Sequence, residues 1–490
     1  MRVETSARRH ELAVVLAGPG AAVKRLRLHW KDALPEGWKY LGDAWERGYG
    51  DLGWRSLDGG RVMPWYFLAT DGKTTHGYGV KTGPGALCHW TAEATGVTLD
   101  ADVRCGGTGV RLGCRKLDVM TVVARRGEPG EAPFTAAREF CRMMCPKARL
   151  PVGPVYGFNN WYCNYGRDTA GAFLDNAEYL AGLAPADAIR PFAVVDAGWQ
   201  GGADTAKDAA VPAGWDRANP AFSPGASMAD IARRIRDMKA RPGLWCRPLI
   251  AGLGHPPEWR LPRDHAYLDP SVPAVRVYVR DMISRFKKWG YELIKHDFST
   301  WDITGRWGFE MAGDMTGDGW AFADRGLTTA EVIRDLYRDI RKAAGPDTLI
   351  IGCNTVGHLA AGLVEIQRIG DDTSGEDWSR TRKMGVNSLA FRAPQHGTFF
   401  AIDGDCVGQT ATDSVPWEKN RQWLDLLARS GTPLFVSFKK DTVSPFQEEA
   451  LRAAFSAASG ELATGEPVDW LDNPTPTRWM LEGKEKTFDW

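Results

Sequence analysis

The sequence of 490 residues predicts an α/β fold, a (β/α)8 TIM barrel preceded by an N-terminal antiparallel β-sandwich. Residues 1–150 contain short strand patterns between turns and a linking helix, which is typical of a sandwich domain. Residues 151–460 alternate apolar strand runs with amphipathic helices, which is typical of a barrel. Residues 461–490 hold a short C-terminal β segment. No glycine-rich phosphate fingerprint follows any strand run, which disfavours a doubly wound sheet.

The N-terminal elements are predicted as strands because their apolar residues recur with a period of two. Val97–Val103 alternates in this way, and Leu117–Ala124 follows after Gly- and Arg-rich turns. Asp58–Gly60 and Asp71–Gly72 mark turns. A helix over 134–144 then leads to the barrel.

Eight apolar runs predict the barrel strands, and helices separate them. The runs are Val155–Phe158, Phe192–Val195, Gly243–Trp245, Glu292–Ile294, Leu349–Gly352, Val364–Ile369, Phe399–Ile402 and Pro433–Ser437. The helices include Met228–Lys239, Ala274–Trp289, Thr329–Ala344 and Asn420–Arg429. Eight such units in roughly 290 residues fit a (β/α)8 barrel, which often has about 250. In the tail, Arg478–Leu481 and Thr487–Trp490 are two further strand candidates, too few for an independent domain.

The composition is that of a soluble globular protein without an excess of positive or negative charge. Lys plus Arg and Asp plus Glu both number 61, so neither nucleic acid nor an anionic membrane surface is an expected partner. The nine Cys form no CxxC pair and the first ten residues have no apolar signal segment, so we expect reduced cysteines and a cytoplasmic location. The nine His show no metal-ligand spacing, and no cofactor is implied.

The 21 Trp suit packing against sugar rings, although core packing explains most single Trp residues.

Asp297 is the candidate nucleophile. It follows the apolar run Glu292–Ile294, where that strand should end. Side chains alternate along a strand, so Lys295 and Asp297 point to the same side. The neighbouring ammonium favours an ionised carboxylate. The alternative interpretation is a surface ion pair after a buried strand.

The carboxyl ends of the other predicted strands carry the same kind of polar and aromatic residues, and reactive residues of barrels lie at these ends. These ends are 159–164 with Trp161, Asp196–Trp199, Trp245–Pro248, Cys353–Asn354, Arg368–Thr373 and Asp403–Cys406. These strand ends carry carboxylates, amides, Arg and Trp, but no metal-ligand histidines. This set points to glycoside hydrolysis, which needs two carboxylates on opposite sides of a sugar.

The second carboxylate is expected to be Asp371 or Asp372. Strand parity from Arg368 places Asp372 on the side of the arginine. The alternative is a polar turn, because Gly370–Gly375 has good loop chemistry. The sequence leaves the choice between the two acids open.

Five motifs in this order resemble the melibiase clan, the retaining α-galactosidases and their relatives of glycoside hydrolase families 27 and 36. They are Asp-x-Gly-Trp (196–199), Gly-Leu-Trp (243–245), Lys-x-Asp (295–297), Arg-x-x-x-Asp (368–372) and Ser-Gly-Thr-Pro-Leu-Phe-Val-Ser (430–437). The match spans most of 150–440, and the preceding sandwich resembles the N-terminal domain of family 36.

The resemblance implies a role for each matching residue. Asp297 is the expected nucleophile and Asp372 the expected acid/base. The resemblance also implies that Asp196, Lys295 and Arg368 contact sugar hydroxyls, that Trp199 and Trp161 form walls, and that Cys353 forms the floor. Apart from the resemblance, the strand ends give Trp245, Asn354 and Asp371 as further expected lining residues. The implied substrate is an oligosaccharide or glycoside, and a homo-oligomer is left open.

The sequence departs from the clan at strand two and at its C-terminal end. Ala197 stands where many members carry a second acid that grips hydroxyls of galactose, a loss of roughly 1.5–3 kcal/mol. Asp405 or Asn354 is a candidate replacement, and N-acetylgalactosamine becomes an alternative to galactose. The C-terminal sandwich of family 36 is reduced to a remnant.

The expected activity is hydrolysis of terminal α-linked galactose or N-acetylgalactosamine by a retaining, exo-acting double displacement. Retention predicts carboxyl groups about 5–5.5 Å apart. The acid must have a raised pKa, for which repulsion from Asp371 and Asp297 is one source, while Arg368 acts against it. Two alternatives are a transglycosylase of the raffinose-synthase type and a non-catalytic carbohydrate-binding barrel.

Overall fold

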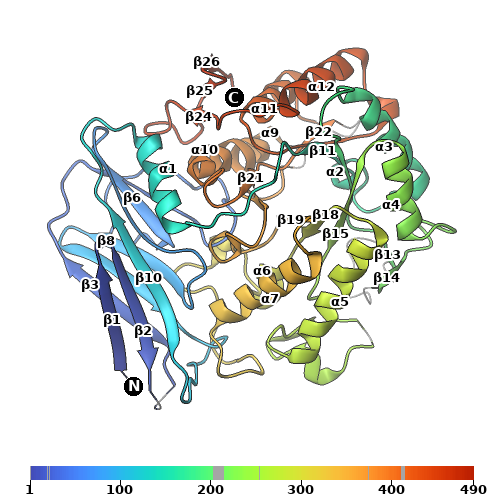
Figure 1. Cartoon of the computed structure of the whole chain (residues 1–490). Coiled ribbons are helices and arrows are strands. Elements are labelled where there is room, and N and C mark those ends of the chain that lie inside the picture. Colours follow the sequence, from blue (N-terminus) through green and yellow to red (C-terminus); the bar gives the residue numbers. More distant parts are fainter. Residues whose placement is uncertain are drawn as a thin grey trace.

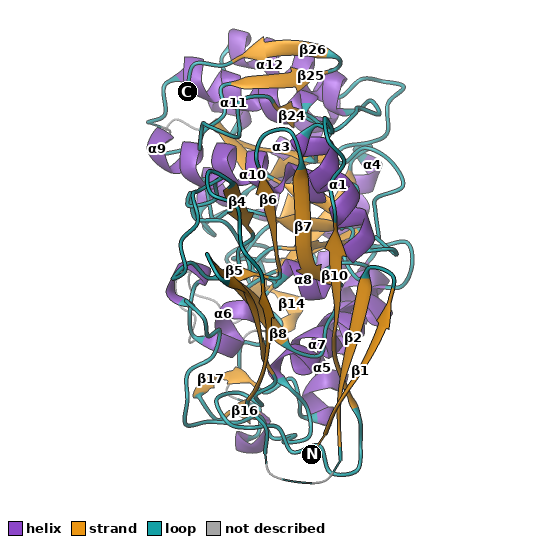
Figure 2. Ribbon diagram, turned by 90° about the vertical axis from the view of Figure 1, so that its left-hand side faces the viewer, coloured by secondary structure: helices purple, strands orange, loops and turns teal. Residues whose placement is uncertain are grey.

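The computed structural model describes residues 2–18, 20, 22–201, 214–252, 254–373, 375–409 and 414–490. Two β-sheets formed by the N-terminal part of the chain stand beside a barrel of strands and helices (Figure 1). Seen from the side of these sheets, their strands cover one flank of the barrel (Figure 2). The fold class predicted from the sequence is confirmed.

The N-terminal domain packs a six-stranded sheet (β1-β2-β10-β7-β6-β4) on a four-stranded sheet (β3-β9-β8-β5), both antiparallel. The strands are β1 Arg2–Arg8, β2 Glu11–Ala17, β3 Arg25–Lys31, β4 Lys39–Gly42, β5 Met63–Pro64, β6 Tyr66–Thr70, β7 Thr75–Val80, β8 Leu87–Glu93, β9 Gly96–Asp102 and β10 Leu117–Arg125. Phe67 of β6 meets Trp90 of β8 edge to face at 5.7 Å between the two sheets. Helix α1 (Pro133–Met144) lies on β7, where a Cβ on Gly77 would stand 2.4 Å from the ring of Phe140.

The barrel is a parallel sheet in the order β21-β20-β19-β18-β15-β12-β11-β23-β22. Its strands are β11 Tyr156–Asn159, β12 Phe192–Val195, β15 Arg241–Cys246, β18 Leu293–His296, β19 Leu349–Gly352, β20 Ile366–Arg368, β21 Ala401–Asp403, β22 Cys406–Gln409 and β23 Leu434–Phe438. The two edge strands, β21 and β22, are consecutive segments separated only by Gly404 and Asp405, so the sheet closes on itself through one bent strand. Asp405 makes this bend with a φ of +78°. Eight strand positions result, as the sequence predicts.

Helices and short hairpins complete the barrel. The helices are α2 Trp161–Asn164, α3 Ala170–Leu183, α4 Met228–Asp237, α5 Pro273–Trp289, α6 Ser299–Thr304, α7 Thr329–Ala344, α8 Gly357–Ala360, α9 Trp378–Thr381, α10 Ser388–Arg392, α11 Trp417–Arg429 and α12 Pro445–Ala458. The hairpins are β13 Gln200–Gly201 with β14 Gly214–Ala218, and β16 Arg260–Leu261 with β17 Asp264–Leu268. Within the described ranges, no helix is both long enough and apolar enough to cross a membrane.

The C-terminal segment forms a three-stranded sheet of β24 (Glu466–Pro467), β25 (Arg478–Leu481) and β26 (Lys484–Thr487). The predicted strand Thr487–Trp490 is wrong by three residues, because β26 begins directly after the turn at Glu482 and Gly483. Both turn residues have a positive φ, 51° and 76°, as a two-residue hairpin requires. The charged β26 has no apolar alternation, which explains why the sequence pattern missed it.

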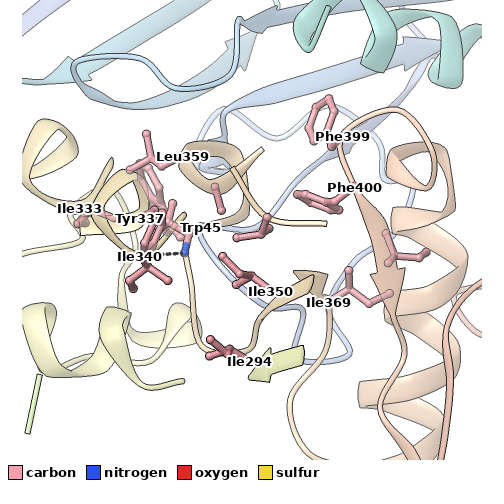
Figure 3. Packing of buried hydrophobic residues seen from close by; sticks show 14 of the residues in the cluster. Trp45, Ile294, Ile333, Tyr337, Ile340, Ile350, Leu359, Ile369, Phe399 and Phe400 are labelled. Carbon is pink, nitrogen blue, oxygen red and sulfur yellow. Dashed lines mark hydrogen bonds between the residues drawn. The ribbon is translucent and has the colours of Figure 1, made fainter. Parts of the chain in front are cut away.

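The sandwich and the barrel share one hydrophobic core. His358 of α8 stacks on Trp65 at 4.9 Å, and its Nε2 lies 2.9 Å from the carbonyl of Val80. Figure 3 shows Trp45, from the loop after β4, in the same packed cluster as Tyr337 of α7 and Ile350 of β19. This shared core fixes the loop that carries Trp45 against the barrel.

Two buried histidines and one half-buried histidine predict a pH-dependent stability. Burial lowers the pKa of His296, His358 and His396 to about 4. An unfolded chain protonates these rings near pH 6.5, so it binds more protons than the folded chain between pH 6.5 and about 4. We therefore expect the free energy of unfolding to fall as the pH falls through this window, by about 1.4 kcal/mol per unit of pKa difference for each ring.

Urea unfolding over a pH series measures this slope. His358→Gln should flatten it, because one of the rings is removed, whereas His265→Gln, at an exposed position, should leave it unchanged. An equal slope in the wild type and in His358→Gln would contradict this explanation.

Candidate active site

Asp297 lies directly after β18, and three N–H groups hold its carboxylate. Oδ1 accepts from the backbone N–H of Phe298 at 2.7 Å and of Asn354 at 3.1 Å. Oδ2 accepts from the indole Nε1 of Trp245 at 3.0 Å. Asp297 is 8% exposed, and Phe298 turns the chain away with a left-handed φ of 62°. The carboxylate therefore has one fixed orientation and one small opening to solvent.

Lys295, two residues earlier on the same strand, pairs directly with Asp196. Its Nζ lies 2.7 Å from Oδ2 of Asp196, which also accepts from Nδ2 of Asn159 at 2.7 Å. Burial acts to lower the pKa of Lys295, but the charge of Asp196, with a further contribution from Asp297, raises it well above its usual value. The ammonium is thus charged and acts on Asp297 by its field, while its hydrogen bond goes to Asp196.

Asp372 is paired with Arg368, the last residue of β20. Nη2 of Arg368 lies 3.0 Å from Oδ1 of Asp372, with the arginine side chain 2% exposed and the carboxylate 42% exposed. The two side chains thus share one side of the chain, as strand parity predicts. Asp371 points elsewhere, to Nη1 of Arg47 at 3.1 Å and Nη2 of Arg380 at 2.7 Å.

The pKa of Asp372 is lowered, which corrects the expectation of a raised value. Partial desolvation raises this pKa, but the charges of Arg368, Arg47, Lys295 and Arg380 together outweigh that effect. The expected repulsion from Asp371 fails because two arginines neutralise that carboxylate. In the free protein Asp372 is therefore an ionised carboxylate.

The sandwich contributes residues to this site that the sequence analysis did not identify. They lie in the loop 43–62 between β4 and β5. Gly48 donates its N–H to the carbonyl of Ile369 at 2.7 Å and accepts from the N–H of Asp371 at 3.3 Å. Between Ile369 and Asp371, a Cβ on Gly370 would stand 1.8 Å from the carbonyl of Met384, so the chain at position 370 requires glycine. The length of the loop is a signal, since loops longer than about 12–15 residues are usually functional.

Glu46, in this loop, is fully buried and connects the sandwich to Asn354. Its carboxylate accepts from Nδ2 of Asn354, from the hydroxyl of Tyr49 and, at 3.0 Å, from the N–H of Gly308. Burial raises the pKa of Glu46, and the charge of Arg47 acts in the opposite direction. The side-chain oxygen of Asn354 accepts from the N–H of Trp301 at 2.9 Å. Asn354 thus supports Asp297 through its backbone, and its side chain bonds to Glu46 and Trp301.

Asp405, the other candidate replacement for a second acid, uses its Oδ2 within the protein. It pairs with Arg368 and accepts from the hydroxyl of Tyr162 and from the N–H of Thr373 at 2.8 Å. Burial raises its pKa, against the charge of Arg368. Both candidates for the role of the acid that Ala197 lacks thus also make contacts within the protein.

The three predicted tryptophans lie in different environments. Trp161 is partly exposed and packs on Tyr165 at 5.6 Å. Trp245 is 6% exposed and donates to Asp297. Trp199 is 0% exposed, donates its Nε1 hydrogen to the carbonyl of Trp245 and packs on Trp215. Trp199 therefore belongs to the core, which corrects its prediction as a wall of the sugar pocket.

Two further predicted residues are buried close to the charged groups. Cys353 is 2% exposed, and its sulfur lies 4.0 Å from Nη1 of Arg368. Arg247, at the end of β15, pairs with the buried Asp302 at 2.7 Å and lies 4.2 Å above the ring of Phe298. In the described part of the chain, His, Cys, Asp and Glu side chains form no group that could hold a metal ion.

Solved structures with the same fold are α-galactosidases, and no family model matches the chain. TtGalA from Thermus thermophilus has a TM-score of 0.64 and 15% identity, and the match covers 99% of each chain. The GH36 α-galactosidase AgaA from Geobacillus stearothermophilus has a TM-score of 0.64 and 14% identity, over 96% of this chain and 69% of AgaA. The galactosidase domain of AgaSK has a TM-score of 0.60 and 16% identity, over 91% of this chain and 63% of that one. The chain therefore has the fold of the GH36 α-galactosidases.

The role of Glu46 gives a test of the contact between sandwich and barrel. Glu46→Gln keeps the shape of the side chain but replaces one acceptor oxygen by an NH2 group. This NH2 group cannot accept the hydrogen bonds that the neighbouring donors give to Glu46. We expect a loss of about 1–3 kcal/mol in the free energy of unfolding, because a buried donor or acceptor loses its partner. Glu36→Gln, at an exposed position of the same domain, is the matched control. Equal stability of both variants in urea unfolding would contradict the proposed link.

Proposed function

We propose that the protein is a retaining, exo-acting α-glycosidase that removes terminal α-linked galactose or N-acetylgalactosamine. Asp297 is the nucleophile and Asp372 the acid/base. One observation carries this proposal: Arg368, which pairs with Asp372 at 3.0 Å, lies 4.0 Å from the sulfur of Cys353, and the next residue along the chain donates its backbone N–H to Asp297. The two acids therefore belong to one electrostatic neighbourhood.

The different surroundings of the two carboxylates fit two different roles. Asp297 is nearly buried and is fixed by three N–H donors, which suits a nucleophile that must meet the anomeric carbon in one direction. Asp372 is 42% exposed, so the leaving group and the incoming water can both reach it. In the first step Asp297 attacks while Asp372 gives its proton to the departing oxygen. In the second step Asp372 takes a proton from water, which releases the sugar with its configuration retained.

Buried polar groups around the two carboxylates are suited to the hydroxyls of a sugar. Asp196 and Lys295 form a charged pair in this region. Nε of Arg368 is a buried donor without a hydrogen-bond partner in the described ranges. Trp161 offers a partly exposed aromatic face. Galactosides are the first substrates to test, because the TtGalA structures contain p-nitrophenyl α-D-galactopyranoside and stachyose.

A panel of nitrophenyl α-glycosides of galactose, N-acetylgalactosamine, glucose and arabinose tests the proposal, with the β-anomers as controls. Asp297→Ala should lower kcat by at least about a thousandfold, because the group that forms the covalent bond is lost. Asp281→Ala, at an exposed position of α5, should keep full activity. NMR of the first product should show the α-anomer. Unchanged turnover in Asp297→Ala would refute the site, and a main product that depends on an added sugar acceptor would replace hydrolysis by transfer.

The lowered pKa of Asp372 predicts the pH dependence of kcat/KM, which reports on the free enzyme. The first step requires protonated Asp372, and this form disappears as the pH rises through a pKa below the usual value. We therefore expect kcat/KM to decline towards neutral pH from an acidic optimum.

Arg380→Gln removes one of the charges that lower the pKa of Asp372, so the decline of kcat/KM should move to higher pH. Lys383→Gln removes an exposed cation nearby and serves as the matched control. Identical pH profiles of Arg380→Gln and the wild type would contradict the assignment of Asp372 as the acid.

A further inference from the structure

A pocket at the junction of the sandwich and the barrel lies apart from the proposed catalytic site. Its volume is about 310 Å³. It is lined by residues 81–83 after β7, by the end of α1 and the linker (144–147), by α7, and by residues 359–363. None of the described lining residues belongs to the proposed catalytic site. The pocket therefore needs an explanation of its own.

The charged side chains in the wall of this pocket are all basic. They are Lys81, Lys147, Arg334 and Arg338. The whole chain has equal numbers of basic and acidic residues, so four cations without an acid among the described lining residues are a local excess. Carboxylates outside the wall neutralise two of the four. Glu11 pairs with Lys81, and Asp335 pairs with Arg338 at 3.0 Å.

Lys147 and Arg334 keep their charges without such a partner. Lys147 is exposed, and neither residue forms an ion pair within the described ranges. Glu331, one turn before Arg334 on α7, pairs instead with Arg115 at 2.6 Å. Burial and the charge of Arg338 lower the pKa of Arg334, against the attraction of nearby carboxylates. Two positive charges thus face the pocket without a described counter-ion.

We propose that this pocket binds the phosphate group of a small phosphorylated molecule. A phosphate monoester carries a charge of about −1.5 to −2 at pH 7, which matches the two cations that lack a carboxylate. Guanidinium and ammonium groups form strong, charge-assisted hydrogen bonds to phosphate oxygens. This inference goes beyond the proposed function and does not depend on it.

The shape of the pocket favours a sugar phosphate among such molecules. Its volume lies at the lower end of the roughly 300–1,000 Å³ of small-molecule sites, so a phosphate group and a small organic body both fit. The described lining residues include no aromatic ring on which a nucleobase could stack. Free phosphate shares the same chemistry, and the test below separates the two.

A bound phosphate should also hold the sandwich and the barrel together. Gly83, in the loop after β7, donates its N–H to the carbonyl of His358 at 2.9 Å and accepts from Nη1 of Arg334 at 2.6 Å. These two bonds join the domains at the edge of the pocket. A ligand that contacts both Lys147 and Arg334 binds only the folded arrangement, and it therefore raises the unfolding temperature.

The test is calorimetric titration of glucose 6-phosphate and of inorganic phosphate into the wild-type protein at low salt, with glucose as the control. We expect saturable binding of glucose 6-phosphate and no binding of glucose. Tighter binding of glucose 6-phosphate than of phosphate would support a sugar phosphate as the ligand, and equal affinities would support free phosphate. Binding of neither anion at millimolar concentration would overturn the site.

Variants at exposed positions locate the binding without a risk to the fold. Lys147→Gln should weaken the binding of glucose 6-phosphate about tenfold, the size of one charge-assisted hydrogen bond. It should also reduce the rise in unfolding temperature that the ligand causes. Lys288→Gln, which removes an exposed cation of α5, is the matched control. Affinities equal to that of the wild type in both Lys147→Gln and Arg338→Gln would overturn this pocket as the phosphate site.

Discussion

The neutralisation of buried charge is the constraint on which this site depends. Taking a charged group out of water costs several kcal/mol unless a partner of opposite charge is in place. The barrel mouth meets this requirement with three contacts, Lys295 with Asp196, Arg368 with Asp405, and Arg47 with Asp371. Two of these contacts lie within the barrel, but the third joins the barrel to the sandwich. The N-terminal domain is therefore a part of the electrostatics of the site and not only a support for the fold.

This arrangement explains why the two carboxylates differ although both are aspartates at strand ends. Asp297 receives neutral donors, two from the backbone and one from Trp245, and makes no ion pair within the described ranges. Asp372 lies among four cations and is open to solvent. The first environment holds the carboxylate of Asp297 in one orientation, and the second leaves Asp372 as an open carboxylate that is ionised when no ligand is bound. Without the sandwich, Asp371 would lose its ion pair with Arg47. The repulsion between Asp371 and Asp372 that the sequence analysis expects would then act on Asp372.

The sequence predicts what depends on local periodicity and misses what depends on distant partners. All eight strand positions could be found, because buried parallel strands are apolar runs, and β12 and β19 have the bounds predicted. The bend at Asp405 and the position of β26 could not, since turn residues with positive φ determine them. Within the site, strand ends and parity point to Asp297 and to Asp371 or Asp372 as candidates, and the choice between the last two stays open in the sequence. The use of Asn354 by Glu46 could not be predicted, because the partner lies 308 residues away in the chain.

The shared use of Arg368 suggests how one aspartate can serve as acid and then as base. Arg368 forms ion pairs with both the buried Asp405 and the solvent-exposed Asp372. In the proposed mechanism a bound sugar covers Asp372 and removes water from it, which raises the pKa of a carboxyl group. The cations that lower this pKa stay in place because Asp371 and Asp405 hold them. Binding of the substrate thus favours the protonated acid of the first step, and departure of the leaving group, which readmits water, favours the carboxylate that the second step needs.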